Sequence, residues 1–224
     1  MFSATPETPR LPDILGREIV RHIERDIIAL RLAPGAKITE EEVCRRYGVS
    51  RSPVREALQI LEAHGLVERW PRRGVFVAPI TVARLDEVYA CRVPLEGLAA
   101  AAVATTASDD GIATLRAALG RMEDAAAQGR PDDAFAANVD ITDALHANCG
   151  NATLRGLLAN LDKQALRFRY FCYSRSPDMI ALSLASNQAL MMALEARDAA
   201  TAQAVTEDLI RRSWTLVRGV LEAA

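Results

Sequence analysis

The sequence is poor in the residues that build disulfide frameworks and cysteine-rich metal sites. Its 224 residues include four cysteines and three histidines. The cysteines are Cys44, Cys91, Cys149 and Cys172, and no two of them form a Cys-x-x-Cys pair. Cysteines scattered among helical patterns are typical of buried, reduced thiols. We therefore expect a fold without a disulfide framework.

Long apolar runs are also missing. No apolar segment is long enough to span a bilayer, and the N-terminus lacks the apolar core of a signal peptide. We expect a cytoplasmic protein that does not contact a membrane. Aromatic residues make up 5% of the sequence, whereas 50% of the residues are hydrophobic, with Ala and Leu predominant. This composition favours a mostly helical protein of one or two domains.

The charge has no large excess of one sign. A net charge of −2 excludes a uniformly basic surface for nucleic acid. Residues 10–79 carry 13 Lys and Arg against 10 Asp and Glu, whereas residues 80–224 carry 14 against 18. A mildly basic first part and an acidic second part fit a DNA-contacting domain joined to a separate body.

Residues 49–66 carry the pattern of a helix that binds in a DNA groove. Ser50 is the expected N-cap, and Gly65 follows the last apolar residues as the expected C′ glycine. Arg51 and Arg55 are four residues apart and share one helix face, where arginines can reach phosphates and guanine edges. Taken alone, the segment also fits an ordinary amphipathic surface helix.

The flanking segments favour the DNA-binding interpretation. An amphipathic helix is expected over residues 17–32 and a short strand over residues 36–38. Thr39 then begins a second helix, with Glu42 completing a capping box. That helix ends near Gly48, and a tight turn leads into the DNA-binding helix. Two short helices joined by such a turn make a helix-turn-helix.

A hairpin with a basic tip follows. Residues 66–70 and 75–77 alternate as strands, and Arg72 and Arg73 lie between them. Both arginines would reach the DNA backbone or the minor groove, and Gly74 would permit a tight turn close to the DNA. A plain surface hairpin is the alternative. Its position after a helix-turn-helix favours the wing of a winged helix-turn-helix.

The remaining chain has a helical pattern throughout. The expected helices span residues 85–105, 109–128, 132–149, 153–173, 179–196 and 199–222. Such a set suggests an antiparallel bundle with an interior cavity. The expected fold is mainly α, with a winged helix-turn-helix over residues 12–79 and an all-helical antiparallel bundle over residues 80–224. Residues 1–11 are expected to be a disordered arm.

Motifs in the first part occur in a recognisable order. They are Leu32-x-Pro34-Gly35, Ile38-x-Glu40, Tyr47-Gly48-Val49-Ser50-Arg51-x-Pro53-Val54-Arg55-Glu56-Ala57-Leu58, Leu61, Gly65-Leu66-Val67 and Arg73-Gly74-x-Phe76-Val77. This part resembles the DNA-binding domain of the GntR family of bacterial transcription regulators. The resemblance implies that Arg51 and Arg55 contact operator DNA and that Gly74 approaches the DNA backbone. Ser52, Arg45 and Arg46 are further candidates for DNA contacts.

The second part resembles the FCD effector-binding domain of the FadR-type branch of this family. The carrying motifs are Arg92-x-x-Leu95-Glu96, Leu145-His146, Gly150-Asn151-x-x-Leu154 and Leu194-Glu195-Ala196-Arg197-Asp198. The resemblance implies a transcription regulator, usually a repressor, whose operator affinity a small molecule controls. A twofold dimer on a palindromic operator is expected.

The metal ligands of many FCD domains do not match this sequence. Those domains bind a divalent metal through one Asp and three His, and a carboxylate effector docks on the metal. Only His146 matches. Thr142 occupies the Asp position, and Asn187 and Leu209 occupy the other two His positions. Asp143 and His146 remain candidate ligands, but two residues do not supply the three or four that such a site needs. We expect no metal cofactor.

Arginines are the expected replacement for the metal. Arg92 matches a family arginine that faces the cavity, and Arg167 and Arg169 lie near another inward-pointing position. A guanidinium can hold a carboxylate without metal. The predicted effector is therefore a small anion, a carboxylic acid, bound by these arginines with His146 and Asn187 as neutral partners.

Several alternatives stay open. Arg92 can pair with Glu96 at i+4, and His146 can be a satisfied core histidine. An apolar effector such as an acyl chain also fits, because Leu209 adds apolar surface. An effector-free architectural DNA-binding protein with a filled core and a metal-dependent regulator with a non-standard site are further alternatives. An enzyme is disfavoured, because residues 80–224 lack a Ser/His/Asp order, a glycine-rich phosphate loop and a paired-His motif.

Overall fold

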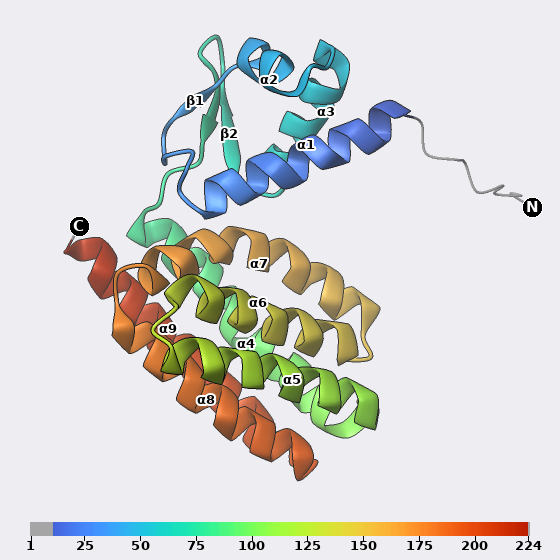
Figure 1. Ribbon diagram of the computed structural model, residues 1–224, viewed down its shortest axis with the longest axis vertical. Helices are drawn as coiled ribbons and strands as arrows, with labels where there is room; N and C mark the ends of the chain where they lie inside the picture. Colours follow the sequence, from blue (N-terminus) through green and yellow to red (C-terminus); the bar gives the residue numbers. More distant parts are fainter. Residues whose placement is uncertain (1–10, 224) are drawn as a thin grey trace, which may run out of the picture. The chain divides into compact units, whose positions relative to one another are not determined.

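The computed structural model describes residues 11–223, and their side chains from residue 15 onward (Figure 1). These residues form nine helices and three strands. A first compact unit ends at Pro79 and a second begins at Ile80. The predicted disordered arm lies outside the described residues, except for Leu11, which is the first residue of a helix. Within residues 11–223, no helix combines the length and apolarity needed to cross a membrane.

The first unit is a winged helix-turn-helix, as predicted. Its elements are α1 (Leu11–Ile28), β1 (Lys37–Ile38), α2 (Glu40–Tyr47), α3 (Arg51–Ala63), β2 (Val67–Trp70) and β3 (Gly74–Val77). The three strands form an antiparallel sheet in the order β1-β3-β2. Ile23 and Ile27, four residues apart on α1, are buried in one cluster with Leu58 and Leu61 of α3. This core holds α3 in place with its other face exposed.

Local caps set the ends of the short helices, with one correction. The Thr39 side chain accepts a hydrogen bond from the backbone N–H of Glu42, so the predicted cap of α2 is confirmed. Gly65, at φ 67°, begins a Schellman motif after α3, because its N–H bonds to the carbonyl of Glu62 and that of Leu66 to Leu61. Ser50 lies at the N-cap of α3, but its side chain makes no capping hydrogen bond. The predicted N-cap position is therefore right, but the predicted hydrogen bond from the helix to the Ser50 side chain is wrong.

The first helix is displaced from its prediction. Instead of residues 17–32 it covers Leu11–Ile28. Leu30 adopts φ 57°, a left-handed conformation that a helix does not continue through. The turn is closed by the N–H of Leu32, which donates to the carbonyl of Asp26.

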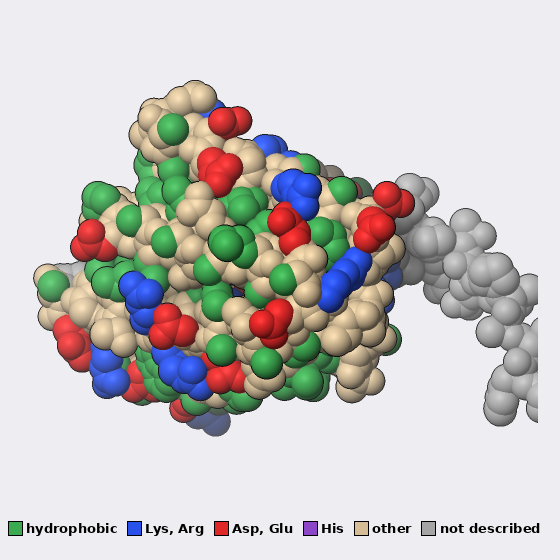
Figure 2. Space-filling view, turned by 90° about the horizontal axis from the view of Figure 1, so that it is seen from below, with side chains coloured by type: hydrophobic (Ala, Val, Ile, Leu, Met, Phe, Trp, Pro, Cys, Tyr) green, Lys and Arg blue, Asp and Glu red, His purple; other side chains and the backbone are tan. Residues whose placement is uncertain are grey.

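The second unit is all helical. Its elements are α4 (Val82–Thr106), α5 (Asp109–Ala127), α6 (Pro131–Asn148), α7 (Ala152–Tyr173), α8 (Pro177–Glu195) and α9 (Ala199–Glu222). Every helix begins and ends within three residues of its predicted bounds. On the face shown in Figure 2, acidic and basic side chains are interspersed with hydrophobic ones, and neither sign of charge forms a continuous field.

The core of the bundle consists of two apolar clusters with polar residues between them. Along α4, Leu85 and Tyr89 belong to one cluster, and Ala99 and Val103 belong to the other. Arg92 lies between these two pairs, and it is 2% exposed. A buried charge is costly unless it is paired and hydrogen-bonded. The side chains whose burial costs the most free energy therefore lie at the centre of the bundle.

Candidate functional site

The exposed face of α3 presents the arginine predicted to read DNA. Arg55 is exposed, and its Nε lies 3.0 Å from both carboxylate oxygens of Glu40. Arg51 and Ser52 are exposed at the start of the same helix, and the Ser52 hydroxyl donates to Glu56 at 3.5 Å. The ion pair between Arg55 and Glu40 is at the surface, and such pairs contribute little to stability. The Arg55 side chain can therefore exchange Glu40 for another acceptor at small cost.

The hairpin tip is basic and its conformation is fixed by local contacts. Arg72 adopts φ 61° and Gly74 adopts φ 106°. The Arg73 guanidinium lies 4.7 Å from the ring centroid of Trp70, on which it stacks. A side chain at position 74 would meet Lys37 at 3.3 Å. The chain at this turn therefore stays close to the sheet, with Arg72 and Arg73 exposed.

The arginines of α2 have different surroundings. Arg45 is exposed and pairs with Glu41 at 3.1 Å. Arg46 is held by Asp26, with Nη2 2.8 Å from Oδ2, and Arg31 binds the other oxygen of that carboxylate. Burial acts to raise the pKa of Asp26, but the hydrogen bonds from the two arginines outweigh it and lower the pKa. Arg46 is thus held by a carboxylate of α1, whereas the partner of Arg45 is an exposed glutamate of its own helix.

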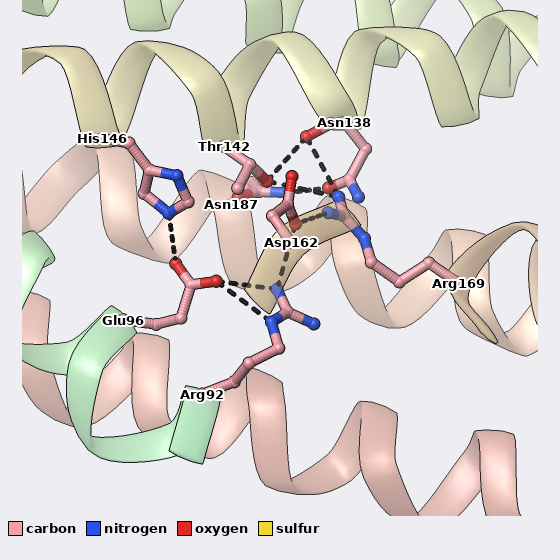
Figure 3. Close-up of polar contacts among 8 residues, drawn as sticks. All are labelled: Arg92, Glu96, Asn138, Thr142, His146, Asp162, Arg169 and Asn187. Atoms are coloured by element: carbon pink, nitrogen blue, oxygen red, sulfur yellow. Dashed lines mark hydrogen bonds and ion pairs between the residues drawn. The ribbon is translucent and has the colours of Figure 1, made fainter. Parts of the chain in front are cut away.

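The bundle contains a buried chain of charged side chains that starts on α4 (Figure 3). Arg92 donates to Oε1 of Glu96 through Nη2 at 2.8 Å and Nε at 3.2 Å. Residues four apart on a helix share a face, so this pair forms within one turn. The other oxygen, Oε2, lies 2.8 Å from Nε2 of His146 on α6. An ionised carboxylate accepts only, so His146 donates from this nitrogen.

The chain of contacts continues across α7. Arg169 donates through Nη1 to Oδ1 of Asp162 at 2.9 Å, and Nη2 of Arg92 lies 3.9 Å from the same oxygen (Figure 3). Nη2 of Arg169 reaches the hydroxyl of Thr142 at 3.2 Å and the backbone carbonyl of Asn138 at 3.4 Å. In this polar network the two guanidiniums and the two carboxylates balance one another in charge.

A small cavity adjoins this network. Its volume is about 40 Å³. It is lined by Tyr89, Arg92, Glu96, Asn138, Ile141, Thr142, Leu145, Arg169, Tyr173, Met179, Ser183, Asn187, Leu190, Thr206, Leu209, Ile210 and Ser213. Asn187 of α8 donates to the side-chain oxygen of Asn138 at 3.1 Å. Ligand pockets for drug-sized molecules are about 300–1,000 Å³. The bundle is therefore closed, and a ligand of more than a few atoms requires its helices to move apart.

Three buried hydroxyls in this cavity lack partners. Tyr89 is 0% exposed, and Tyr173 and Thr206 are each 3% exposed. Among the residues that the structure describes, none of these hydroxyls has a hydrogen-bond partner. Buried polar groups are nearly always hydrogen-bonded, and an unsatisfied one is costly. These three hydroxyls are therefore suited to contact a bound molecule.

Comparison with known proteins assigns the chain to a family. Residues 15–77 match the family of bacterial regulatory proteins named gntR, and residues 87–212 match the FCD domain. The HTH-type transcriptional repressor RspR of Escherichia coli is 30% identical over 204 residues, which cover 87% of this chain and 86% of RspR. The chain belongs to the GntR family. This confirms the resemblance identified in the sequence, and it makes the protein a DNA-binding transcription regulator rather than an enzyme.

Further similarities agree with this GntR assignment. YdhC of Bacillus subtilis, an uncharacterized HTH-type transcriptional regulator, is 37% identical over 99 residues, which cover 44% of each chain. The structure of E. coli McbR/YncC superposes with a TM-score of 0.80 at 19% identity, over 92% of this chain and 97% of McbR. A putative GntR regulator from Rhodococcus superposes with a TM-score of 0.76 at 22% identity, over 91% and 97%. These two structures share the fold.

The small cavity beside the polar network is lined by three of the five predicted effector residues. Arg92, Arg169 and Asn187 line it. His146 does not, because it lies behind Glu96 and reaches the cavity only through that carboxylate. Arg167 is buried but outside the cavity wall. Side chains two positions apart on a helix point about 200° away from each other, so Arg167 and Arg169 cannot face the same cavity.

Sequence reasoning missed several members of the site. Glu96 appeared only as the alternative partner of Arg92, and that pairing is the one the structure contains. Asp162 was not predicted at all. It lies two turns before Arg169, on the same face of α7. Asn138 and Thr142 precede His146 at intervals of four on α6. This polar stripe within an apolar helix face was the available signal.

The residues at the family's metal positions do not form a metal site. Among residues 11–223, no group of three or more His, Cys, Asp or Glu side chains is arranged to hold a metal ion. Thr142 donates to the carbonyl of Asn138, and Leu209 offers no ligand atom. Asp143 is exposed on α6 and does not line the cavity. These side chains therefore do not provide the set of ligands that the family's metal ion needs.

The protonation of Glu96 gives the first testable prediction. Burial acts to raise the pKa of Glu96, but the Arg92 charge and the hydrogen bond from His146 outweigh it and lower the pKa to about 2. A lowered pKa means that this carboxylate stabilises the fold fully above its ordinary value of 4.5, and that its contribution is lost as the pH falls toward 2. We expect the wild-type melting temperature to fall steeply below about pH 4.5, and Glu96→Gln to flatten that dependence. Thermal unfolding from about pH 7 to about pH 3 measures this, and identical slopes would contradict it.

Proposed function

We propose that this protein is a cytoplasmic repressor that binds a palindromic operator as a homodimer and is released by a small carboxylic acid. A palindromic operator suits the protein, because two copies of α3 related by a twofold axis read two half-sites. The similarity to RspR, which is named a repressor, supports the direction of regulation. The observation that carries the effector assignment is the buried cavity beside Arg92 and Arg169, with three hydroxyls that lack partners.

The proposed acid binds without metal. Arg92 and Arg169 are already neutralised by Glu96 and Asp162. The buried cavity donors without a partner are the hydroxyls of Tyr89, Tyr173 and Thr206. A carboxylate that enters accepts from these hydroxyls and shares the guanidinium of Arg92 with Glu96. Charge-assisted hydrogen bonds of this kind are stronger than neutral ones.

The small cavity also explains how binding is communicated. Because the cavity holds about 40 Å³, the acid must displace the helices that surround it. α4 contributes Tyr89, Arg92 and Glu96, and only residues 78–81 separate it from the end of β3. A displacement of α4 therefore acts on the chain that leads to the wing. By linkage, operator binding weakens acid binding by the same factor.

The test is operator release by defined acids. An operator is selected from random DNA, labelled, and bound to the full-length protein, and butanoate or succinate is titrated while fluorescence anisotropy is recorded. We expect release by at least one of these acids, with and without a chelator, and no bound metal by elemental analysis. Release that requires metal would favour the metal-dependent alternative. A protein that binds its operator but responds to no acid would support the effector-free alternative.

A second prediction separates a ligand-binding hydroxyl from a structural one. Tyr89→Phe keeps the ring, which packs against Trp214 and beneath Arg92, and removes only the hydroxyl. Because this hydroxyl has no partner, we expect the free energy of unfolding to stay the same or to rise by up to about 1 kcal/mol. Affinity for the acid falls about 10- to 150-fold, the range for a hydrogen bond to a charged group.

Chemical denaturation and operator release measure the two quantities on the same protein. Tyr170→Phe, on α7 and outside the cavity lining, is the matched control and leaves acid affinity unchanged. Loss of stability in Tyr89→Phe with unchanged acid response would show that this hydroxyl is structural.

A further inference from the structure

The bundle has a second, much larger cavity that opens at its surface. Its volume is about 890 Å³. The turn between α5 and α6 forms one side, and the turn between α7 and α8 forms the other, at the same end of the bundle (Figure 1). We call it the outer groove.

The outer groove offers apolar surface. Ala126 and Pro131 line one side, and Ile180, Ala181 and Leu184 of α8 line the other. The long polar side chains of the groove already have hydrogen-bond or ion-pair partners. Gln188 donates to Glu123 at 2.7 Å, Arg130 pairs with Asp133, and Arg175 donates to the carbonyl of Phe171 at 3.3 Å. A ligand in the groove would therefore be held by contact with apolar atoms.

The walls of the outer groove and of the small cavity beside Arg92, which we call the inner cavity, share one residue. That residue is Tyr173. It is the last residue of α7, directly before the turn to α8, and it is 3% exposed. Phe135 packs edge-on against its ring with the centroids 5.4 Å apart. The Tyr173 ring is thus part of the wall of both spaces, at the end of its helix.

We propose that the effector site extends past Tyr173 into the outer groove, and that the effector is a carboxylic acid with an apolar chain. This rests on the proposed function, because the acid group is the one that the inner cavity receives. The inner cavity supplies the polar partners but has little volume, whereas the outer groove has volume and apolar walls. A molecule with a charged head and an apolar chain matches both. Each buried methylene raises affinity about fourfold, which corresponds to about 0.8 kcal/mol.

The experiment compares straight-chain acids of increasing length. Butanoate, hexanoate and octanoate are titrated into the full-length protein on its operator, and release is recorded by fluorescence anisotropy. We expect the affinity to rise with each methylene, up to about 200-fold from butanoate to octanoate. If octanoate binds no more tightly than butanoate while both release the operator, the proposed function stands and the outer groove is not part of the site. If no acid releases the operator, the proposed function itself fails.

Two alanines on α8 provide a matched pair of variants. Ala181 and Ala185 are both exposed and lie one turn apart, but only Ala181 lines the outer groove. Ala181→Glu places a carboxylate in the groove, and we expect it to lose most of the chain-length gain while the butanoate response remains. Ala185→Glu changes octanoate affinity by no more than about twofold, as is usual for a surface substitution. Light scattering shows the oligomeric state of both variants. A change of oligomeric state in Ala181→Glu alone, with octanoate affinity retained, would make the groove a subunit interface and overturn the proposal.

Discussion

Replacing Arg55 with alanine is expected to weaken operator binding about 5- to 150-fold, the range of about 1–3 kcal/mol for a bidentate base contact. Arg55 projects from the exposed face of α3, which the apolar core of the first unit holds in place. Its only described ion pair is the exposed one with Glu40, which contributes little to stability. The variant should therefore fold normally and lose DNA affinity.

Titration of labelled operator with the Arg55→Ala variant measures this loss. Arg212→Ala is the matched control, because Arg212 is an exposed arginine of α9 whose ion pair with Asp208 is also at the surface. Arg45→Ala tests the phosphate contact, and it should weaken binding to all DNA sequences and reduce its salt dependence. Operator affinity that is unchanged in Arg55→Ala would show that α3 does not read DNA through this residue.

Replacing Glu96 with glutamine is expected to lower the free energy of unfolding by about 3–5 kcal/mol, because it leaves a buried charge without its partner. Arg92 and Glu96 are each 2% exposed. After the substitution, the carboxylate nearest to Arg92 is Asp162 at 3.9 Å, and Arg169 already binds it at 2.9 Å. Such a loss is a large share of the stability of most domains.

The Arg212–Asp208 pair is again the matched control. It has the same i, i+4 spacing, but both side chains are about 60% exposed. Asp208→Asn should change the free energy of unfolding by less than about 1 kcal/mol. Urea denaturation at one fixed protein concentration compares the two variants, since the stability of a dimer depends on concentration. Equal, small effects would mean that water reaches Arg92 when its partner is removed.

The polar network also links stability to regulation. Its members come from α4, α6, α7 and α8, so it spans most of the bundle (Figure 3). A ligand that competes with Glu96 for Arg92 changes contacts on all four helices together. Buried polar networks of this kind are disrupted as a unit, because each remaining group loses partners.

The sequence by itself determined the local structure of this protein. The isoleucine spacing of α1, the Thr39–Glu42 cap and the glycine after α3 act within one or two helical turns, so they can be identified without knowledge of the fold. The same holds for the DNA-binding surface, because α3 and the wing are contiguous in sequence. Even at this level the prediction that Ser50 caps α3 was wrong in part. Ser50 has the backbone conformation of an N-cap, but its side chain makes no capping hydrogen bond.

The tertiary structure alone decided the composition of the candidate effector site. Glu96 meets His146 across 50 residues of sequence, and Asn138 meets Asn187 across 49. No spacing rule reaches that far, because the angle at which helices pack determines which side chains meet. Packing placed Arg169 in the cavity and Arg167 outside it, and it put His146 behind Glu96. It also closed the cavity to about 40 Å³, because interior volume is what remains after all side chains are packed.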